Sequence, residues 1–132
     1  AGSPDIILVK YNSTGTKQWT RQLGTPGRNE GNGVAVDNSG NVYVTGSTNG
    51  NLDGNINAGV DDIVLVKYNS AGVRQWTRQL GTYAYDYGYG VAVDNSGNVY
   101  VTGMTGGDLD GNINAGDYDG FLVKYDSNGV KQ

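Results

Sequence analysis

The chain has 132 residues, among them 23 glycines and two prolines but no cysteine or histidine, and its formal net charge is −4. The missing residue types exclude disulfides, metal sites built on thiolate or imidazole ligands, and catalytic triads that need histidine. The net negative charge with singly scattered Lys and Arg argues against a nucleic-acid partner, and no segment approaches the roughly 20 apolar residues of a membrane span.

After residues 1–4, which we interpret as a tag scar or linker, the first 46 residues predict four short strands. β-Branched and aromatic residues fill these segments, and Asn, Ser and Gly form the turns between them. No segment sustains a 3.6-residue apolar period, so helices are not expected and the chain is predicted to be all-β. The predicted strands are Asp5–Tyr11, Lys17–Leu23, Gly33–Asp37 and Asn41–Gly46.

The same pattern then repeats with a period of 57 residues, because Asp5, Asp62 and Asp119 are equivalent. Residues 5–132 are therefore one repeat region of about 2.3 copies: 5–61, 62–118 and a partial third copy at 119–132. The first two copies differ at about 15 positions. In each copy the strand DIILVKY or DIVLVKY is apolar almost throughout, which favours burial on both faces. Four short strands per unit with such a strand predict propeller blades of four antiparallel strands, ahead of a sandwich.

Specific strings support this interpretation. GVAVDNSGNVYVTG occurs at 33–46 and again at 90–103, and DIVLVKYNSAGVRQWTRQLGT occupies 62–82. These strings resemble the SBBP repeat, the repeat of seven-bladed bacterial β-propellers. The resemblance implies that GVAVD is the inner strand of a blade, followed by NVYVTG, DIVLVKY and RQWTRQL. The chain would then contain one whole blade (33–80) between the last two strands of one blade (5–23) and the first three of another (90–125).

Both partial blades leave strand edges open, and open edges are templates for other chains. We expect copies to associate, the N-terminal strands of one chain completing the C-terminal blade of the next. Three or four chains would make a ring of 6–8 blades, although the third strand at 119–125 is then surplus. The alternative is an excised piece of a longer propeller. A natural scaffold of this kind would be extracellular or at the cell surface; a designed protein is equally compatible with the near-identical repeats.

The long connections are expected at one end of the strands, and the short turns at the other. Most differences between the copies fall in the long connections at 24–32, 81–89, 47–61 and 104–118, where a ligand face is expected. Aromatic residues at alternate positions, which would lie on one side of an extended segment, could contact a glycan, a peptide or a protein, or else pack between blades or between subunits. They are Tyr83, Tyr85, Tyr87 and Tyr89, which replace Pro26, Arg28, Glu30 and Asn32 of the first copy.

Two of these loops also carry oxygen side chains at every second position, which resembles the start of a calcium loop. Glycine stands at the fourth position instead of the sixth, and the bidentate Glu is missing. Turns capped by the same side chains are the alternative. The candidate calcium ligands are Asn51, Asp53, Asn55, Asn57, Asp108, Asp110, Asn112 and Asn114.

No catalytic constellation is expected. Glu30 is the only glutamate and its counterpart is Tyr87, so paired carboxylates for glycoside hydrolysis are not repeated. Trp19 and Trp76 are expected to pack in the core or between blades. Lys10, Lys67 and Lys124 recur at one strand position, where they would pair with a repeated Asp or cover apolar surface with their stems. The predicted function is a structural propeller scaffold, with a ligand-binding module as the alternative.

Overall fold

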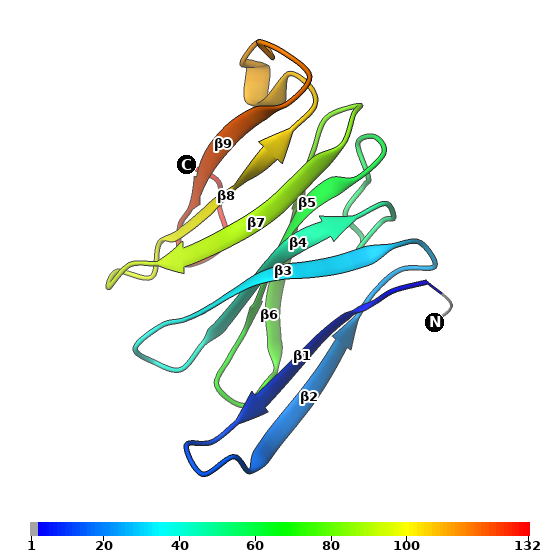
Figure 1. Cartoon of the computed structure of the whole chain (residues 1–132). Helices are drawn as coiled ribbons and strands as arrows, with labels where there is room; N and C mark the ends of the chain where they lie inside the picture. The colour runs from blue at the N-terminus through cyan, green and yellow to red at the C-terminus, as the bar shows by residue number, and fades with distance from the viewer. Residues whose placement is uncertain (1–2) are drawn as a thin grey trace.

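A computed structural model of the chain describes residues 3–132, which contain nine strands and one short 3₁₀ turn (Figure 1). Residues 1 and 2, half of the predicted tag scar or linker, lie outside the described residues. None of the described helical structure is long and apolar enough to cross a membrane. The elements are β1 (Ile6–Tyr11), β2 (Lys17–Leu23), β3 (Asn29–Val36), β4 (Val42–Thr48), β5 (Asp62–Tyr68), β6 (Arg74–Leu80), β7 (Asp86–Val93), β8 (Val99–Thr105), η1 (Leu109–Gly111) and β9 (Asp119–Tyr125).

The strands form three antiparallel sheets in chain order, and this confirms the predicted blade frame. We call the hairpin β1-β2 blade 1, the four-stranded sheet β3-β4-β5-β6 blade 2, and the sheet β7-β8-β9 blade 3. Blade 2 is the one complete blade in residues 3–132. In blade 3 a single bridge between Tyr125 and Lys131 stands where the fourth strand would begin.

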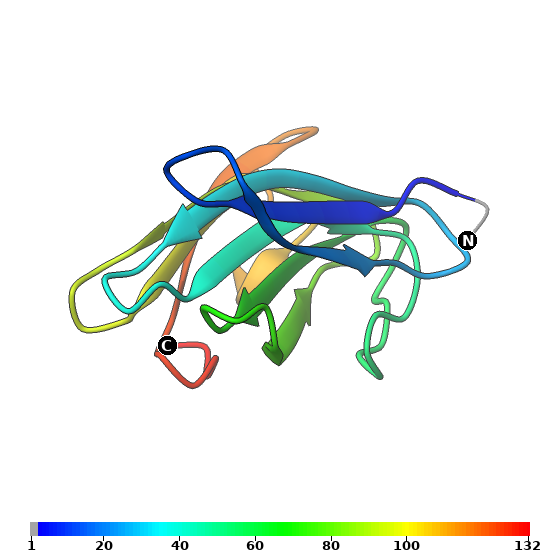
Figure 2. The ribbon, with the colours of Figure 1, turned by 90° about the horizontal axis from the view of Figure 1, so that it is seen from below.

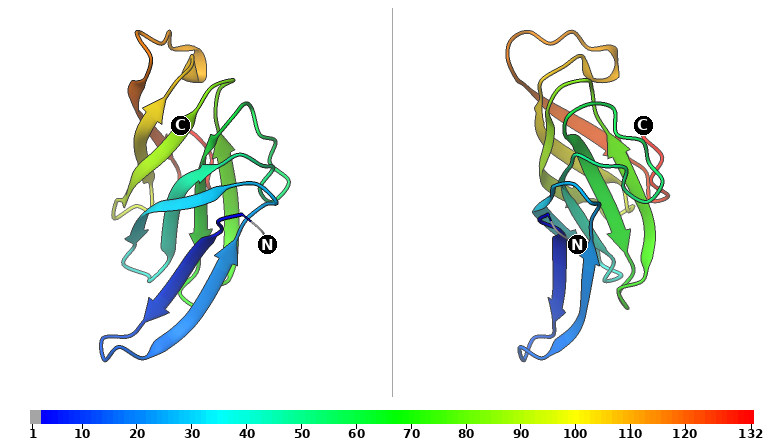
Figure 3. Two further views of the ribbon diagram at one scale, coloured as in Figure 1. Left: turned by 45° about the vertical axis from the view of Figure 1, so that its right-hand side comes forward. Right: turned by 90° about the vertical axis from the view of Figure 1, so that its right-hand side faces the viewer.

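The blades stack as successive layers, with the inner strands β3 and β7 in contact (Figures 2 and 3). Blade 2 lies in the middle, and β4 is buried along its whole length. Two apolar cores hold the stack together, one on each face of blade 2. The core toward blade 1 comprises Ile6, Leu23, Val42, Val44, Leu52, Val64, Val66 and Tyr68. The core toward blade 3 comprises Tyr43, Ile63, Leu65, Val99, Val101, Leu109 and Tyr125.

Equivalent residues of the repeat show that the outer faces of the stack are open. Leu65 of blade 2 is 1% exposed, whereas its equivalent Leu122 of blade 3 is 70% exposed. On the other side, Val64 is fully buried, whereas Ile7 of blade 1 is 56% exposed. The same apolar strand is therefore covered on both faces only where it has a blade on each side.

The short turns and the long connections lie at opposite ends of the strands, as expected; in Figure 1 the turns are at the lower left and the long connections at the upper right. The inner strands nevertheless begin earlier than predicted, at Asn29 and Asp86 instead of Gly33 and Gly90. These residues pair with the end of the next strand of their own blade, Asn29 with Thr48 and Asp86 with Thr105. A bond between blades supports each start, because the Asp86 N–H donates to the Asp61 carbonyl at 2.7 Å and Asn29 repeats this bond with Pro4. The connections between blades are therefore shorter than expected.

At the short-turn end, a Lys, a Trp and an Arg of one blade donate hydrogen bonds to backbone carbonyls in a turn of the next blade. We call this contact the clasp. Trp76 Nε1 donates to the Ser127 carbonyl at 3.3 Å, and Lys67 Nζ donates to the same oxygen at 3.2 Å. Arg78 lies over the Trp76 ring and donates to the Gly129 carbonyl at 2.5 Å. The clasp between blades 1 and 2 has the same bonds, made by Lys10, Trp19 and Arg21 to the turn 69–73.

The clasp confirms the packing role between blades that was predicted for the tryptophans. For the lysines, a repeated Asp partner or cover of apolar surface was predicted; the ammonium groups of Lys10 and Lys67 donate to the backbone carbonyl of a serine in the next blade. The ammonium groups of Lys67 and Lys124 also lie over tyrosine rings of their own blade.

Candidate functional site

The predicted tyrosines lie at and just before the start of the inner strand β7, at the long-connection end of the stack. Tyr85, Tyr87 and Tyr89 form what we call the tyrosine row, because alternation along an extended backbone places them on one side. Neighbouring rings in the row have centroids 6.1 Å apart and planes inclined by 17° and 11°. The ring planes are therefore nearly parallel, and Tyr85 and Tyr89 are 42% and 46% exposed.

A charged cluster adjoins the row. Arg28, next to β3, forms an ion pair with Asp61 at 2.5 Å, and the Tyr87 hydroxyl donates to the same Asp61 oxygen at 3.4 Å. Arg28 also pairs with Glu30 at 3.3 Å. Hydrogen bonding with Tyr87 and the charge of Asp61 raise the pKa of the Arg28 guanidinium. The cluster joins two blades, because Asp61 and Arg28 belong to blade 2 and Tyr87 to blade 3.

The cluster contains one of two neighbouring buried carboxylates. Asp61 and Asp62 are each 1% exposed, and within the part of the chain that the structure describes one oxygen of each has no hydrogen-bond partner. The second Asp62 oxygen accepts the Ala58 N–H at 2.8 Å and the Gln79 amide at 2.9 Å. Burial raises the pKa of Asp62, and the charges of Asp86 and Asp61 add to this effect.

Tyr83, the fourth predicted contact, lies outside the row. It precedes β7 in the connection and is 76% exposed. The structure therefore brings together three of the four predicted tyrosines. The row offers a ligand the exposed parts of Tyr85 and Tyr89, which combine aromatic surface with hydroxyl groups.

In the first acidic loop, most oxygen side chains are engaged in local turns. Asn51 accepts the Asn57 N–H at 2.9 Å, and Asn57 accepts the Gly59 N–H at 3.0 Å. The Asp53 carboxylate is bound by Thr77 at 2.5 Å and Arg74 at 2.7 Å. No group of three or more acidic, histidine or cysteine side chains converges as metal ligands in the described chain. These contacts agree with the alternative of self-capped turns.

The second loop repeats this arrangement. Asp108 accepts the Asn114 N–H at 2.8 Å, Asn114 accepts the Gly116 N–H at 2.9 Å, and Lys131 forms an ion pair with Asp110. In both loops the central aspartate adopts a positive φ, 52° at Asp53 and 53° at Asp110. Asn55 and Asn112 donate to the leucine carbonyl three residues before them. Calcium binding by these loops stays a prediction.

Sequence reasoning missed Arg28 and Asp61 as members of the site. A signal was present, because the two positions change together between the copies: Arg28 and Asp61 in the first become Tyr85 and Tyr118 in the second. An ion pair is thus replaced by two tyrosines at equivalent positions. Asn32 was likewise missed as an inter-blade contact; its side chain donates to the Gly88 carbonyl at 3.0 Å.

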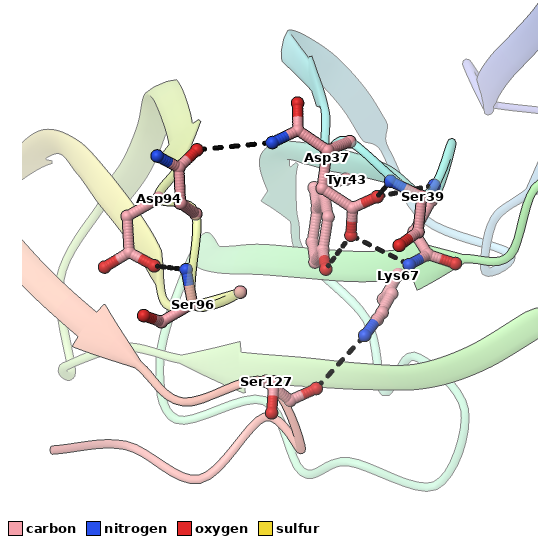
Figure 4. A pocket seen from close by; sticks show the side chains of 11 residues that line it. Asp37, Ser39, Tyr43, Lys67, Asp94, Ser96 and Ser127 are labelled. Carbon is pink, nitrogen blue, oxygen red and sulfur yellow. Dashed lines mark hydrogen bonds between the residues drawn. The ribbon is translucent and has the colours of Figure 1, made fainter.

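A pocket of 220 Å³ at the opposite end lies between the turns of blades 2 and 3 (Figure 4). The Tyr43 hydroxyl donates to Asp37 at 3.0 Å, and the Lys67 ammonium lies 5.4 Å from the centroid of the Tyr43 ring. Burial alone would raise the pKa of Asp37, but hydrogen bonds from Asn41, Tyr43 and Ser39 lower it below the ordinary 3.8. These bonds satisfy the carboxylate within its own turn, so we regard the pocket as part of the blade junction.

Comparison with known proteins identifies the repeat. The family described as a beta-propeller repeat, SBBP, matches residues 18–53 and 75–110. The chain is 30% identical over 145 residues to "Regulatory protein FlaEY" of Caulobacter vibrioides, covering 99% of this chain and 15% of that protein. It is also 30% identical over 127 residues to "Uncharacterized WD repeat-containing protein L264" of Acanthamoeba polyphaga mimivirus, covering 81% of this chain and 9% of that protein. The chain therefore spans less than a fifth of the length of these relatives, and by its repeats it belongs to the SBBP beta-propeller repeat family.

Proposed function

We propose that the chain is a non-catalytic propeller scaffold whose open sheets are completed by copies of itself. One observation carries the proposal. The chain forms the same interface between neighbouring blades twice, and within residues 3–132 one half of that interface is left without a partner at each end of the stack. The turn 12–16 of blade 1 has the form of the turns at 69–73 and 126–130 that receive a clasp. Within residues 3–132, however, no tryptophan lies against Gly15 of this turn. On the far side, the open face of blade 3 carries the exposed Leu122.

The proposal of a non-catalytic role rests on how the carboxylates are used. The buried Asp86 accepts the Thr82 N–H at 2.6 Å and the Thr105 hydroxyl at 2.5 Å, which ties the start of β7 to the end of β8. Asp37 and Asp94 cap their own turns. Asp86, Asp37 and Asp94 thus each have a structural hydrogen-bonding role, which supports a scaffold over a catalytic use of these three carboxylates.

The test is the mass of the folded protein in solution, measured by light scattering across a concentration series. The proposal expects a mass that rises with concentration toward an integral multiple of 13.9 kDa. A monodisperse monomer of 13.9 kDa throughout the micromolar range would refute it.

A ligand-binding role for the long-connection end is the second candidate, and one observation favours it. Eleven of the fifteen differences between the first two copies fall in 26–32 and 47–61 or their equivalents, the segments that build this end. The turns at 37–41 and 94–98 at the other end are identical in sequence. A glycan and peptide screen of wild type against the Tyr85→Ser/Tyr89→Ser variant would test this role; equal binding profiles would argue against it.

A further inference from the structure

We propose that the copies associate by strand exchange, in which the hairpin β1-β2 of one chain replaces β9 at the edge of β8 in a second chain. The inference rests on the proposed self-association and specifies its partner surface. In the exchanged state, β7 and β8 of one copy and β1 and β2 of the other form one complete blade. Each chain then contributes two whole blades, and the strand that was surplus in the predicted ring is the displaced β9.

β1 has the sequence that the edge of β8 already accepts. The last four residues of both β1 and β9 read LVKY, and Asp5 precedes β1 as Asp119 begins β9. β8 pairs with β9 in the register that places Val101 opposite Val123. The 57-residue repeat transfers this register to β1, so that Val101 of the second copy stands opposite Val9. β1 pairs with β2 on one side only, within the described chain, so its other edge can receive β8.

The exchange also fills a groove that the single chain leaves open. A groove of 210 Å³ lies between β1 and β3, where the inner two strands of blade 1 would stand. Val34 and Val36 on β3 are 59% and 60% exposed beside it. Their equivalents in blade 3, Val91 and Val93, pack against the core that contains Leu65. The β7-β8 pair of the second copy would cover Val34 and Val36 as blade 2 covers Val91 and Val93.

The exchanged hairpin brings an outer strand, which blade 3 does not have within residues 3–132. In these residues the single bridge from Tyr125 to Lys131 lies beyond β9, whereas β1 is paired along its length with β2. β9 is therefore an incomplete substitute for the hairpin.

In the exchanged state, the clasp residues of the second copy can bind the turn 12–16 of the hairpin. The turns 12–16 and 126–130 share one geometry: Asn12 and Asp126 cap them, and Gly15 and Gly129 have φ of 79° and 77°. A Cβ at Gly129 would lie 2.9 Å from the Trp76 ring, whereas a Cβ at Gly15 would meet no heavy atom within 4 Å. Gly15 is thus free in the single chain, and Trp76 of the second copy would cover it after exchange.

Matched asparagine substitutions separate the two states, because asparagine tolerates a positive φ better than most residues. Gly129→Asn clashes with the clasp of the single chain and weakens β9, so it should raise the association constant at least tenfold. Gly15→Asn should leave the melting temperature of the monomer near that of wild type and lower the association constant at least tenfold. Light scattering and sedimentation measure both effects.

A second measurement reads the register directly. In the full chain carrying Val9→Cys and Val101→Cys, oxidation should link two chains through a disulfide, because these positions face each other only after exchange. If wild type associates but no intermolecular disulfide forms, or both glycine variants shift association alike, strand exchange is refuted and self-association survives. If wild type stays monomeric at all concentrations, the proposed scaffold function fails and the exchange with it.

Discussion

The repeat allows one chain to test how much a neighbouring blade contributes to stability. Leu65 and Leu122 occupy the same place in blades 2 and 3, with exposures of 1% and 70%. Truncating each to alanine removes the same atoms from the same strand position. The two variants therefore differ in whether a blade covers the side chain.

The expected costs follow from this difference in burial. At Leu65 the change removes a fully buried side chain between β5 and the inner strands of blade 3, and such truncations cost about 3 kcal/mol, with a range of 2.7–5.0 in well-packed cores. At Leu122 only about a third of the side chain is buried, so at about 0.8 kcal/mol per buried methylene the loss is about 0.7 kcal/mol. In a domain of this size, these costs correspond to melting-temperature shifts of roughly 12 °C and 3 °C.

Urea unfolding followed by circular dichroism measures both free energies of unfolding, with Thr14→Ala on the exposed turn of blade 1 as a neutral control. The protein should be studied at a dilution where light scattering shows the monomer alone, because association with a second copy changes the surroundings of Leu122. Equal losses for Leu65→Ala and Leu122→Ala in the monomer would refute the reasoning, since they would require a cover over Leu122 that the stacked blades of one chain do not provide.

Three further outcomes are expected. Arg28→Met should cost about 2 kcal/mol, because it leaves the buried Asp61 without its counter-charge while the exposed half of the arginine contributes little, and Asp61→Asn in the same chain should restore most of the loss in thermal unfolding. Asp37→Asn should lower the melting temperature above pH 3.8, and the difference from wild type should shrink on acidification. The pKa of Asp37 is lower in the folded state than in the unfolded state, so the stabilisation by its carboxylate is lost as the pH falls through the folded-state pKa. A difference that grows in acid would contradict this. Excess calcium and a chelator should give the same melting temperature, because the Asp53 carboxylate is already bound by Arg74 and Thr77; a rise with calcium would instead support the predicted loop site.

Much of this fold could be predicted from the sequence because the repeat supplies each element more than once. β2 has the predicted bounds, Lys17–Leu23, and the order of strands in blade 2 is the predicted one. The early start of β3 could not be predicted, because residues 29–32 are polar or glycine and carry no strand alternation. Their extended backbone depends on partners distant in sequence, such as the Pro4 carbonyl that accepts the Asn29 N–H.

The candidate site was predictable to the extent that it is local. The alternate spacing of Tyr85, Tyr87 and Tyr89 in the sequence was enough to predict that their side chains lie next to one another on one side of an extended segment. The link from Arg28 to Asp61 joins positions 33 residues apart, and the Tyr87 contact crosses from one blade to another. Such contacts depend on how the sheets stack on one another. The alternation of residue types along the sequence predicts strands, but it does not predict which side chains of neighbouring sheets meet.

The clasp has a consequence for how such arrays can change over time. The acceptors that receive Trp76, Lys67 and Arg78 are backbone carbonyls, which every amino acid supplies, so the receiving turn can vary in side chain without breaking its link to the preceding unit. The first clasp receives Asn-Ser-Ala-Gly and the second Asp-Ser-Asn-Gly with the same bonds. Only the glycine is fixed by the tryptophan above it. For the clasp, units joined in this way are interchangeable, so duplication, loss or shuffling of a copy preserves this part of each junction.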